Sequence, residues 1–227
     1  MKKILSGLVL LLMLQVSAAA QLDDKIADRL YESAKVFDEL MKAPDGGAAR
    51  KVLQDAECVG VIPGVKKAAL GIGGTYGRGA VVCRKDNGKG PWGPPSMIAL
   101  GGGSIGFQLG GQSNDIVMLF MTPDSIQRLL KDKVTLGADA SAAAGPKGRE
   151  ISAETSATMR AEILTYGRSQ GVFAGISLKG AVISPDKDAN KSLYKKEVPA
   201  KDLLVTGNVP IPQAARKLIE ALTAAGK

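Results

Sequence analysis

The chain contains no histidine, and that absence excludes several kinds of active site. Its 227 residues include only two cysteines. A Ser-His-Asp or Cys-His catalytic set requires an imidazole base, so neither can form. Histidine-ligated zinc, iron and haem sites are excluded too, and two cysteines alone do not complete a structural zinc site. We therefore expect no metal, no cofactor and no enzymatic activity.

Aromatic residues are also scarce, at 4% of the chain. Nucleic-acid binding is therefore disfavoured, because few rings are available to stack on bases. Long apolar runs are missing as well. Beyond the first twenty residues no run reaches the 18 apolar residues that indicate a membrane-spanning helix.

The first twenty residues have the pattern of a secretory signal peptide. Lys2 and Lys3 precede an apolar run from Leu8 to Leu14, and small residues fill positions 17–20. A basic start, a short apolar stretch and an A-x-A site are typical of such peptides. We expect cleavage near Ala20, a single mature domain over 21–227, and a periplasmic or secreted protein.

Export affects the interpretation of the two cysteines. Cys58 and Cys83 each lie in a β-like run, and disulfides persist in oxidising compartments. The sequence favours a Cys58–Cys83 disulfide, with two buried thiols as the alternative.

Apolar spacing predicts an α+β fold with helices at both ends. A helical stripe covers residues 22–42, a second helix covers 48–57, and Pro212 opens a C-terminal amphipathic helix. The first helix is net acidic, so its stripe is expected to pack on the core, with attachment to a membrane surface as the alternative. Short strands are predicted at 59–62, 68–72, 79–84, 97–100, 105–109 and 116–121, with a helix starting at Thr122-Pro123, a packed strand over 136–145 and a hairpin from 162–168 to 172–183.

Glycine is abundant, and most of it is concentrated in the middle of the chain. Sixteen of the 28 glycines lie between Gly60 and Gly111. Glycines within strands mark bulges, bends or close backbone approach. We therefore expect an antiparallel, strongly coiled glycine-rich sheet or small barrel with the terminal helices packed on it.

Two glycine motifs suggest chemistry that their context does not support. Gly102-Gly-Ser-Ile-Gly106 matches G-x-S-x-G, but no histidine is present to accept the serine proton. Gly101, Gly103 and Gly106 match G-x-G-x-x-G, but a strand follows where a phosphate-binding helix would have to begin.

The segment from Asp186 to Glu197 places oxygen-bearing side chains at calcium-loop spacing. Lys191 stands where such a loop needs glycine, and a strand-like segment precedes it. A polar turn is the favoured interpretation, and the calcium alternative stays open.

Basic residues outnumber acidic ones by 30 to 22, and the excess is concentrated near the middle. If the strands fold back, Lys66 and Lys67 are expected to share one hairpin end with Arg84 and Lys85. Such a cluster attracts anionic headgroups. The sequence predicts a lipid-binding site formed by Lys66, Lys67, Arg78, Arg84 and Lys85, with an ordinary solvated surface as the alternative.

Several motifs together resemble the SYLF domain family over roughly residues 30–195. The matching segments are Val59-Gly-Val-Ile-Pro63, Gly71-Ile-Gly-Gly74, Tyr76-Gly-Arg-Gly79, Gly103-Ser-Ile-Gly-Phe-Gln108, Asp115-Ile-Val-Met-Leu-Phe-Met121 and Gly171-Val-Phe-Ala-Gly-Ile-Ser177. The resemblance implies a lipid-binding module that binds phosphoinositides and is linked to actin assembly in eukaryotic relatives. For an exported bacterial-type member it implies an anionic phospholipid or outer-membrane lipid. The alternative is an envelope protein that recognises a protein or polysaccharide, and the oligomeric state is left open.

Overall fold

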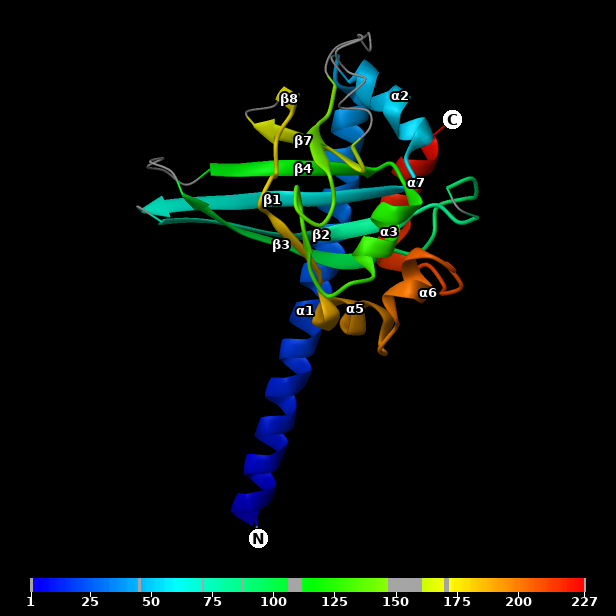
Figure 1. The fold of residues 1–227 in the computed structure, drawn as a ribbon. Coiled ribbons are helices and arrows are strands. Elements are labelled where there is room, and N and C mark those ends of the chain that lie inside the picture. Colours follow the sequence, from blue (N-terminus) through cyan, green and yellow to red (C-terminus); the bar gives the residue numbers. More distant parts are fainter. Residues whose placement is uncertain are drawn as a thin grey trace.

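The glycine-rich middle of the chain forms four long antiparallel strands. They are β1 (Cys58–Leu70), β2 (Ile72–Cys83), β3 (Ser96–Ile105) and β4 (Gln112–Phe120). The structure is a computed structural model that describes residues 2–44, 46–70, 72–86, 88–105, 112–146, 161–169 and 172–226. Figure 1 shows that these strands curl around the centre of the molecule.

Shorter strands widen this sheet, and helices cover it. Within the described residues it has nine strands, in the order β5-β9-β3-β2-β1-β4-β7-β6 with β8 on β7. The short strands are β5 (Val134–Thr135), β6 (Ala142–Ala144), β7 (Ile163–Ser169), β8 (Val172–Gly175) and β9 (Val182–Pro185). The helices are α1 (Lys2–Lys42), α2 (Gly47–Asp55), α3 (Pro123–Leu129), α5 (Lys187–Tyr194), α6 (Ala200–Leu204), the short 3-10 helix η1 (Gln213–Ala215) and α7 (Arg216–Ala225). The predicted α+β class, with a strongly coiled antiparallel sheet and terminal helices, is confirmed, although β6 pairs with β7 in parallel.

The predicted separate strands at 59–62 and 68–72 are wrong, because residues 59–62 and 68–70 both belong to β1 and Ile72 already begins β2. Pro63-Gly64 does not reverse the chain but forms a bulge, where the register with β2 shifts between Val61 and Lys66. Gly64 has a φ of 58° there. A bulge tolerates proline, which lacks an N–H, and glycine, which adopts positive φ without strain. The chain reverses later, between Leu70 and Ile72.

Close backbone approach explains some of the strand glycines. A Cβ on Gly79 would lie 2.0 Å from the carbonyl oxygen of Val61, opposite the bulge. A Cβ on Gly175 would lie 2.2 Å from the carbonyl oxygen of Gly145. A side chain at either position would displace backbone, so the chain's own packing requires glycine there.

The C-terminal half of α1 packs across one face of the sheet (Figure 1). Ile26, Leu30, Phe37 and Leu40 are at most 1% exposed and lie in one core cluster with strand residues and with α7. The prediction that this helix packs on the protein's own core is confirmed. None of the helices in the described part of the chain is long and apolar enough to span a membrane.

The last third of the chain departs furthest from the sequence predictions. The predicted strand over 136–145 is mostly a turn, since the N–H of Gly137 donates to the carbonyl of Ala140 and only Ala142–Ala144 is extended. The predicted long strand over 172–183 divides into β8 and β9, because the chain turns at Gly180, which has a φ of 85°. The predicted C-terminal helix after Pro212 is confirmed. Residues 106–109 of the predicted strand 105–109 lie outside the described residues.

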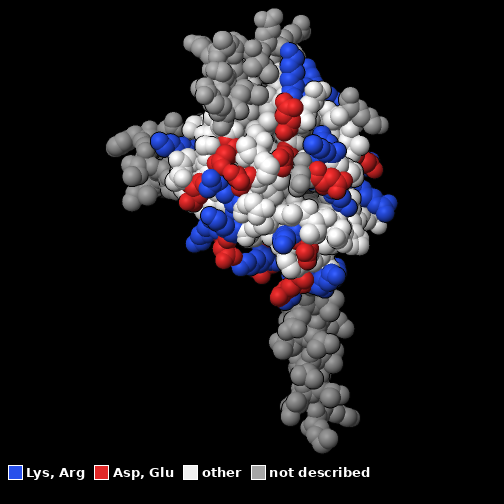
Figure 2. Space-filling model, turned by 45° about the vertical axis from the view of Figure 1, so that its right-hand side comes forward, with Lys and Arg blue, Asp and Glu red and all other residues white. Residues whose placement is uncertain are grey.

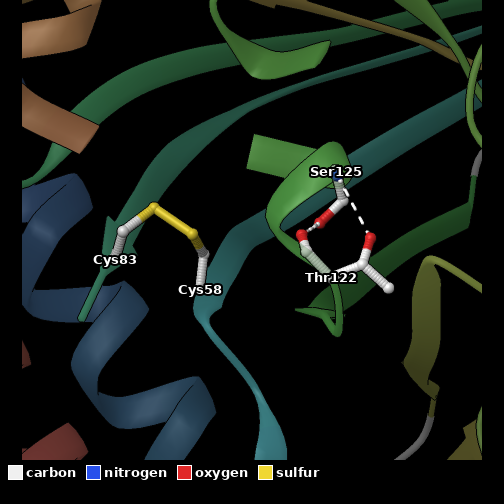
Figure 3. Close-up of a disulfide and its surroundings, with 4 residues drawn as sticks. All are labelled: Cys58, Cys83, Thr122 and Ser125. Atoms are coloured by element: carbon white, nitrogen blue, oxygen red, sulfur yellow. Dashed lines mark hydrogen bonds between the residues drawn. A yellow bond between two sulfur atoms is a disulfide. The ribbon is translucent and has the colours of Figure 1, made fainter. Parts of the chain in front are cut away.

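The two cysteines and the start of α3 lie near each other in the view of Figure 3. Cys58 and Cys83 face each other across the β1–β2 ladder and form a disulfide with an S–S distance of 2.09 Å. Thr122 precedes α3 as its N-cap, and its side chain accepts a hydrogen bond of 3.2 Å from the N–H of Ser125. Pro123 follows at the first helical position, as its sequence predicts.

Thr122→Ala is expected to lower the free energy of unfolding by about 1 kcal/mol, because it leaves the N–H of Ser125 without its side-chain acceptor. Thr122→Ser keeps the hydroxyl and should stay close to the parent. Urea denaturation of the three proteins measures the difference. Equal losses for alanine and serine would show that the cap does not contribute.

Candidate functional site

The four predicted lipid-binding cations whose side chains are described do not form one cluster, and the side chain of the fifth, Lys67, lies outside the described part. Lys66 pairs with Tyr76 near the hairpin turn, whereas Arg84 follows Cys83 at the opposite end of β2. Eight extended residues separate Tyr76 from Arg84, which is about 26 Å at ~3.3 Å per residue. The expectation that Lys66 and Lys67 share a hairpin end with Arg84 and Lys85 is therefore wrong. Its cause is the bulge at Pro63-Gly64, where the prediction placed a turn.

Arg84 is held in the interior of the opposite end. Its guanidinium carbon lies 4.2 Å from the centroid of the Trp92 ring. A Cβ on Gly226, at the C-terminal end of α7, would lie 2.8 Å from Nη2 of Arg84. Burial lowers the pKa of this guanidinium from its ordinary value. A cation is favourable both over an aromatic face and beside a helix C-terminus, so Arg84 is positioned to stabilise the fold.

Lys85 is partly buried next to Arg84. Its methylene groups lie against Gly207, where a Cβ would approach the Lys85 Cε to 2.7 Å. The backbone N–H of Lys85 donates to the carbonyl of Pro91. This packing leaves less of the side chain available to a headgroup than at Lys66, which is exposed.

Arg78 belongs to a charged cluster that joins β2, α1 and α5. Oδ2 of Asp186 lies 3.5 Å from Nη1 of Arg29 and 3.6 Å from Nη1 of Arg78. The Asp186 side chain is 8% exposed and that of Arg78 is 44% exposed. Nε of Arg78 also donates to the hydroxyl of Tyr76. The Arg78 side chain is therefore partly accessible to solvent, while its guanidinium group also contacts Asp186 and Tyr76.

The pKa values of the two arginines are shifted in opposite directions. Burial lowers the pKa of Arg29, while the Asp186 carboxylate partly offsets that shift. The hydrogen bond to Tyr76 is the main cause of the raised pKa of Arg78. Both guanidinium groups stay charged at physiological pH. The cluster therefore carries two positive charges and one negative charge.

Beyond α1, described residues on the same side of the sheet are exposed. Alternation along β2 puts Tyr76 and Gly74 on the side of Ala80 and Val82, which pack beneath α1. Lys66 and Gly101 pair with Tyr76 from β1 and β3. Tyr76 is 52% exposed, and Lys66 and Gly74 are exposed too. We call this surface, formed by Lys66, Gly74, Tyr76 and Gly101, the open face.

The segment from Asp186 to Glu197 is not a calcium loop. Residues 187–194 form α5, and Asp186 is its N-cap, accepting a hydrogen bond of 3.2 Å from the N–H of Ala189. A helix holds these oxygen atoms too far apart along its surface to surround one ion. No group of three or more acidic or cysteine side chains suited to a metal occurs among the residues described.

A cleft of about 580 Å³ lies between the end of α3, α5 and the segment before α6. Two ion pairs flank it, Lys187–Asp132 at 2.8 Å and Lys191–Glu197 at 3.0 Å. All four side chains are more than 60% exposed, so these pairs contribute little to stability. The cleft presents both signs of charge, and the face in Figure 2 likewise shows Lys and Arg interspersed with Asp and Glu.

Sequence reasoning missed Arg29, Tyr76 and Asp186. Arg29 lies within an acidic helix, Tyr76 is one of four tyrosines, and Asp186 fitted the calcium spacing instead. A usable signal was present at Asp186, because Asp followed by a polar, proline-free run is typical of a helix N-cap. The contacts of Arg29 and Arg78 with Asp186 join residues more than 100 positions apart, and no local pattern indicates them.

Comparison with known proteins identifies the family. Residues 101–225, more than half of the chain, match Ysc84, described as "Las17-binding protein actin regulator". The chain is 38% identical over 165 residues to SH3 domain-containing protein PJ696.02 of Schizosaccharomyces pombe, covering 71% of this chain and 38% of that protein.

Two further relatives match similar regions. SH3 domain-containing YSC84-like protein 1 of Homo sapiens is 30% identical over 84% of this chain and 56% of its own length. LAS seventeen-binding protein 3 of Saccharomyces cerevisiae is 33% identical over 75% of this chain and 37% of its own length. The chain thus spans roughly two fifths to three fifths of the relatives that it matches. It belongs to the Ysc84 family, which is the SYLF family that its motifs predict.

Proposed function

We propose that this protein is a non-enzymatic binding module that engages anionic phospholipid headgroups, acting in the periplasm or as a secreted protein after cleavage near Ala20. The signal-peptide pattern supports export, and the Cys58–Cys83 disulfide suits an oxidising compartment. The family resemblance supports lipid as the ligand. The proposal concerns this chain and not the longer relatives.

We assign the headgroup contact to the hairpin end of the sheet. The observation that carries this assignment is the exposure of Lys66 beside the exposed ring of Tyr76, with the half-exposed Arg78 two residues further along β2. Cations attract anionic lipid at about 1 kcal/mol each near the surface. A tyrosine, with an apolar body and a polar tip, suits the boundary between headgroups and acyl chains. At the other end Arg84 is committed to Trp92 and α7.

Lys66→Glu/Lys67→Glu is expected to weaken binding to anionic vesicles about 30-fold, as two attractive cations are lost at roughly 1 kcal/mol each. Co-sedimentation with vesicles of 30% and 0% phosphatidylglycerol measures it. The parent should bind only the anionic vesicles, and less at high salt.

The matched control is Lys85→Glu/Lys89→Glu, which makes the same change in net charge at the opposite end of the sheet. It should keep most of the binding. Equal losses in the two double variants would show that net charge and not the hairpin end governs attraction. Equal binding of the parent to both vesicle types would contradict the proposal.

A second candidate is a protein-interaction module of the cell envelope. The name of the yeast relative, LAS seventeen-binding protein 3, states binding to a protein. Capture of the same envelope protein before and after lipid extraction would favour this function over lipid binding.

A further inference from the structure

Two glycines of the open face have no explanation among the described residues. Glycine weakens a strand interior relative to alanine by roughly 0.5–1 kcal/mol. At Gly77 and Gly79 an added Cβ would lie within 2.7 Å of other atoms of the chain. At Gly74 and Gly101 it would meet nothing within 4 Å, and neither residue has a positive φ. Neither packing against the described residues nor backbone conformation requires these two glycines.

Gly74 and Gly101 lie close together on the same surface. Gly101 pairs with Tyr76, and Gly74 pairs with Gly103 two residues further along β3. A strand glycine without an internal reason commonly marks a place where another backbone or a ligand approaches closely. No described residue approaches this surface closely, so the partner that requires the two glycines is not among the described residues.

We propose that the open face binds helix α1 of a second copy of this protein, in a two-fold symmetric dimer. The charges of Lys66 and of Asp24 and Asp28 favour this partner, although Lys25 and Lys35 are also exposed on α1. Lys66 is exposed on the open face and has no ion-pair partner among the described residues. Asp24 and Asp28 are exposed on the outer side of α1, and within the described residues they are unpaired too. Tyr31, 57% exposed, lies further along the same helix.

The arrangement of α1 and the open face is self-complementary. Both lie on the same side of the sheet, with the open face beyond the helix (Figure 1). When two copies face each other about a two-fold axis, helix α1 of each copy can lie on the open face of the other. Both copies then use the same patch.

The dimensions of the two surfaces agree. Residues 24–35 of α1 extend about 17 Å at ~1.5 Å per residue. The four strands β4, β1, β2 and β3 together are about 15 Å wide at ~4.8 Å spacing. A helix lying across these strands can therefore contact all four.

The first test is Gly101→Val, measured by sedimentation velocity of the purified protein. Valine enters open space and favours a strand, so the unfolding temperature should stay the same or rise. The valine side chain should block the approach of the partner's helix to the open face and so shift the protein from dimer to monomer. Thr75→Val, on the other side of β2, is the matched control and should stay dimeric.

The second test is a charge swap. Asp24→Lys/Asp28→Lys places two lysines opposite Lys66, and Lys66→Glu places a glutamate opposite Asp24 and Asp28. Each variant alone should be monomeric. An equimolar mixture should form a heterodimer. In both of its contacts, residues 24 and 28 of one copy then carry the charge opposite to that of residue 66 in the other copy.

Three results would overturn the proposal: a parent protein that is monomeric at all accessible concentrations, a dimer that Gly101→Val leaves intact, or charge variants that do not recombine. Lys66 also belongs to the proposed lipid site, so vesicles and a second copy would compete for it. The two proposals fail separately, since association is measured without lipid and Gly101→Val keeps every cation in place.

Discussion

Asp186→Ala is expected to lower the free energy of unfolding by about 3 kcal/mol. The change removes the carboxylate that faces Arg29 and Arg78 and leaves two guanidinium groups close together, one of them largely buried. Breaking a buried pair by removing one partner typically costs ~3–5 kcal/mol, and the exposure of Arg78 puts this case at the low end. Urea denaturation measures the loss.

Two further variants separate the causes. Asp186→Asn keeps a side-chain acceptor for the N–H of Ala189 but removes the charge, so most of the loss should persist. Asp188→Ala removes an exposed carboxylate from the same first turn of α5 and should cost less than about 1 kcal/mol. If Asp186→Ala were no more destabilising than Asp188→Ala, the cluster would not join α1 to the sheet.

Replacing both cysteines by alanine is expected to cost about 3.5 kcal/mol. The disulfide closes a loop between residues 25 positions apart, and the chain-entropy relation gives this magnitude for such a loop. The parent unfolded in the presence of a reductant should match the variant, while the variant itself should not respond to reductant.

Thiol titration of the denatured protein provides the direct control for the disulfide. Without reductant it should detect no free thiol in the parent, and with reductant it should detect two. Equal counts under both conditions would show two buried thiols in place of the bridge.

Local patterns predicted most of the elements. The apolar stripe of residues 22–42 and the Thr122-Pro123 start both depend on neighbours a few positions apart, which a sequence displays directly. The glycine concentration predicted the curled sheet for the same reason. The prediction of separate short strands failed at Pro63-Gly64, because a bulge and a turn use the same residue types.

The site was harder to predict, because it depends on register. Lys66 and Arg84 seemed close only while a turn was assumed at Pro63-Gly64. In the structure Lys66 pairs with Tyr76, and most of the length of β2 separates Tyr76 from Arg84. Arg84 has the positive charge expected of a lipid-binding residue, but its guanidinium group lies over the Trp92 ring. Tyr76 gains its importance from Lys66 on β1 and Gly101 on β3, which only strand pairing brings beside it.

The packing of α1 against α7 has a consequence for how the chain reaches its native state. These helices share one core cluster, although they come from the first and last parts of the sequence. α1 therefore has its full set of partners only when α7 has been made. Contacts of such long sequence separation slow folding, because the loop between them must be closed first. Until α7 emerges, the apolar stripe of α1 must be kept from making other contacts in the nascent chain.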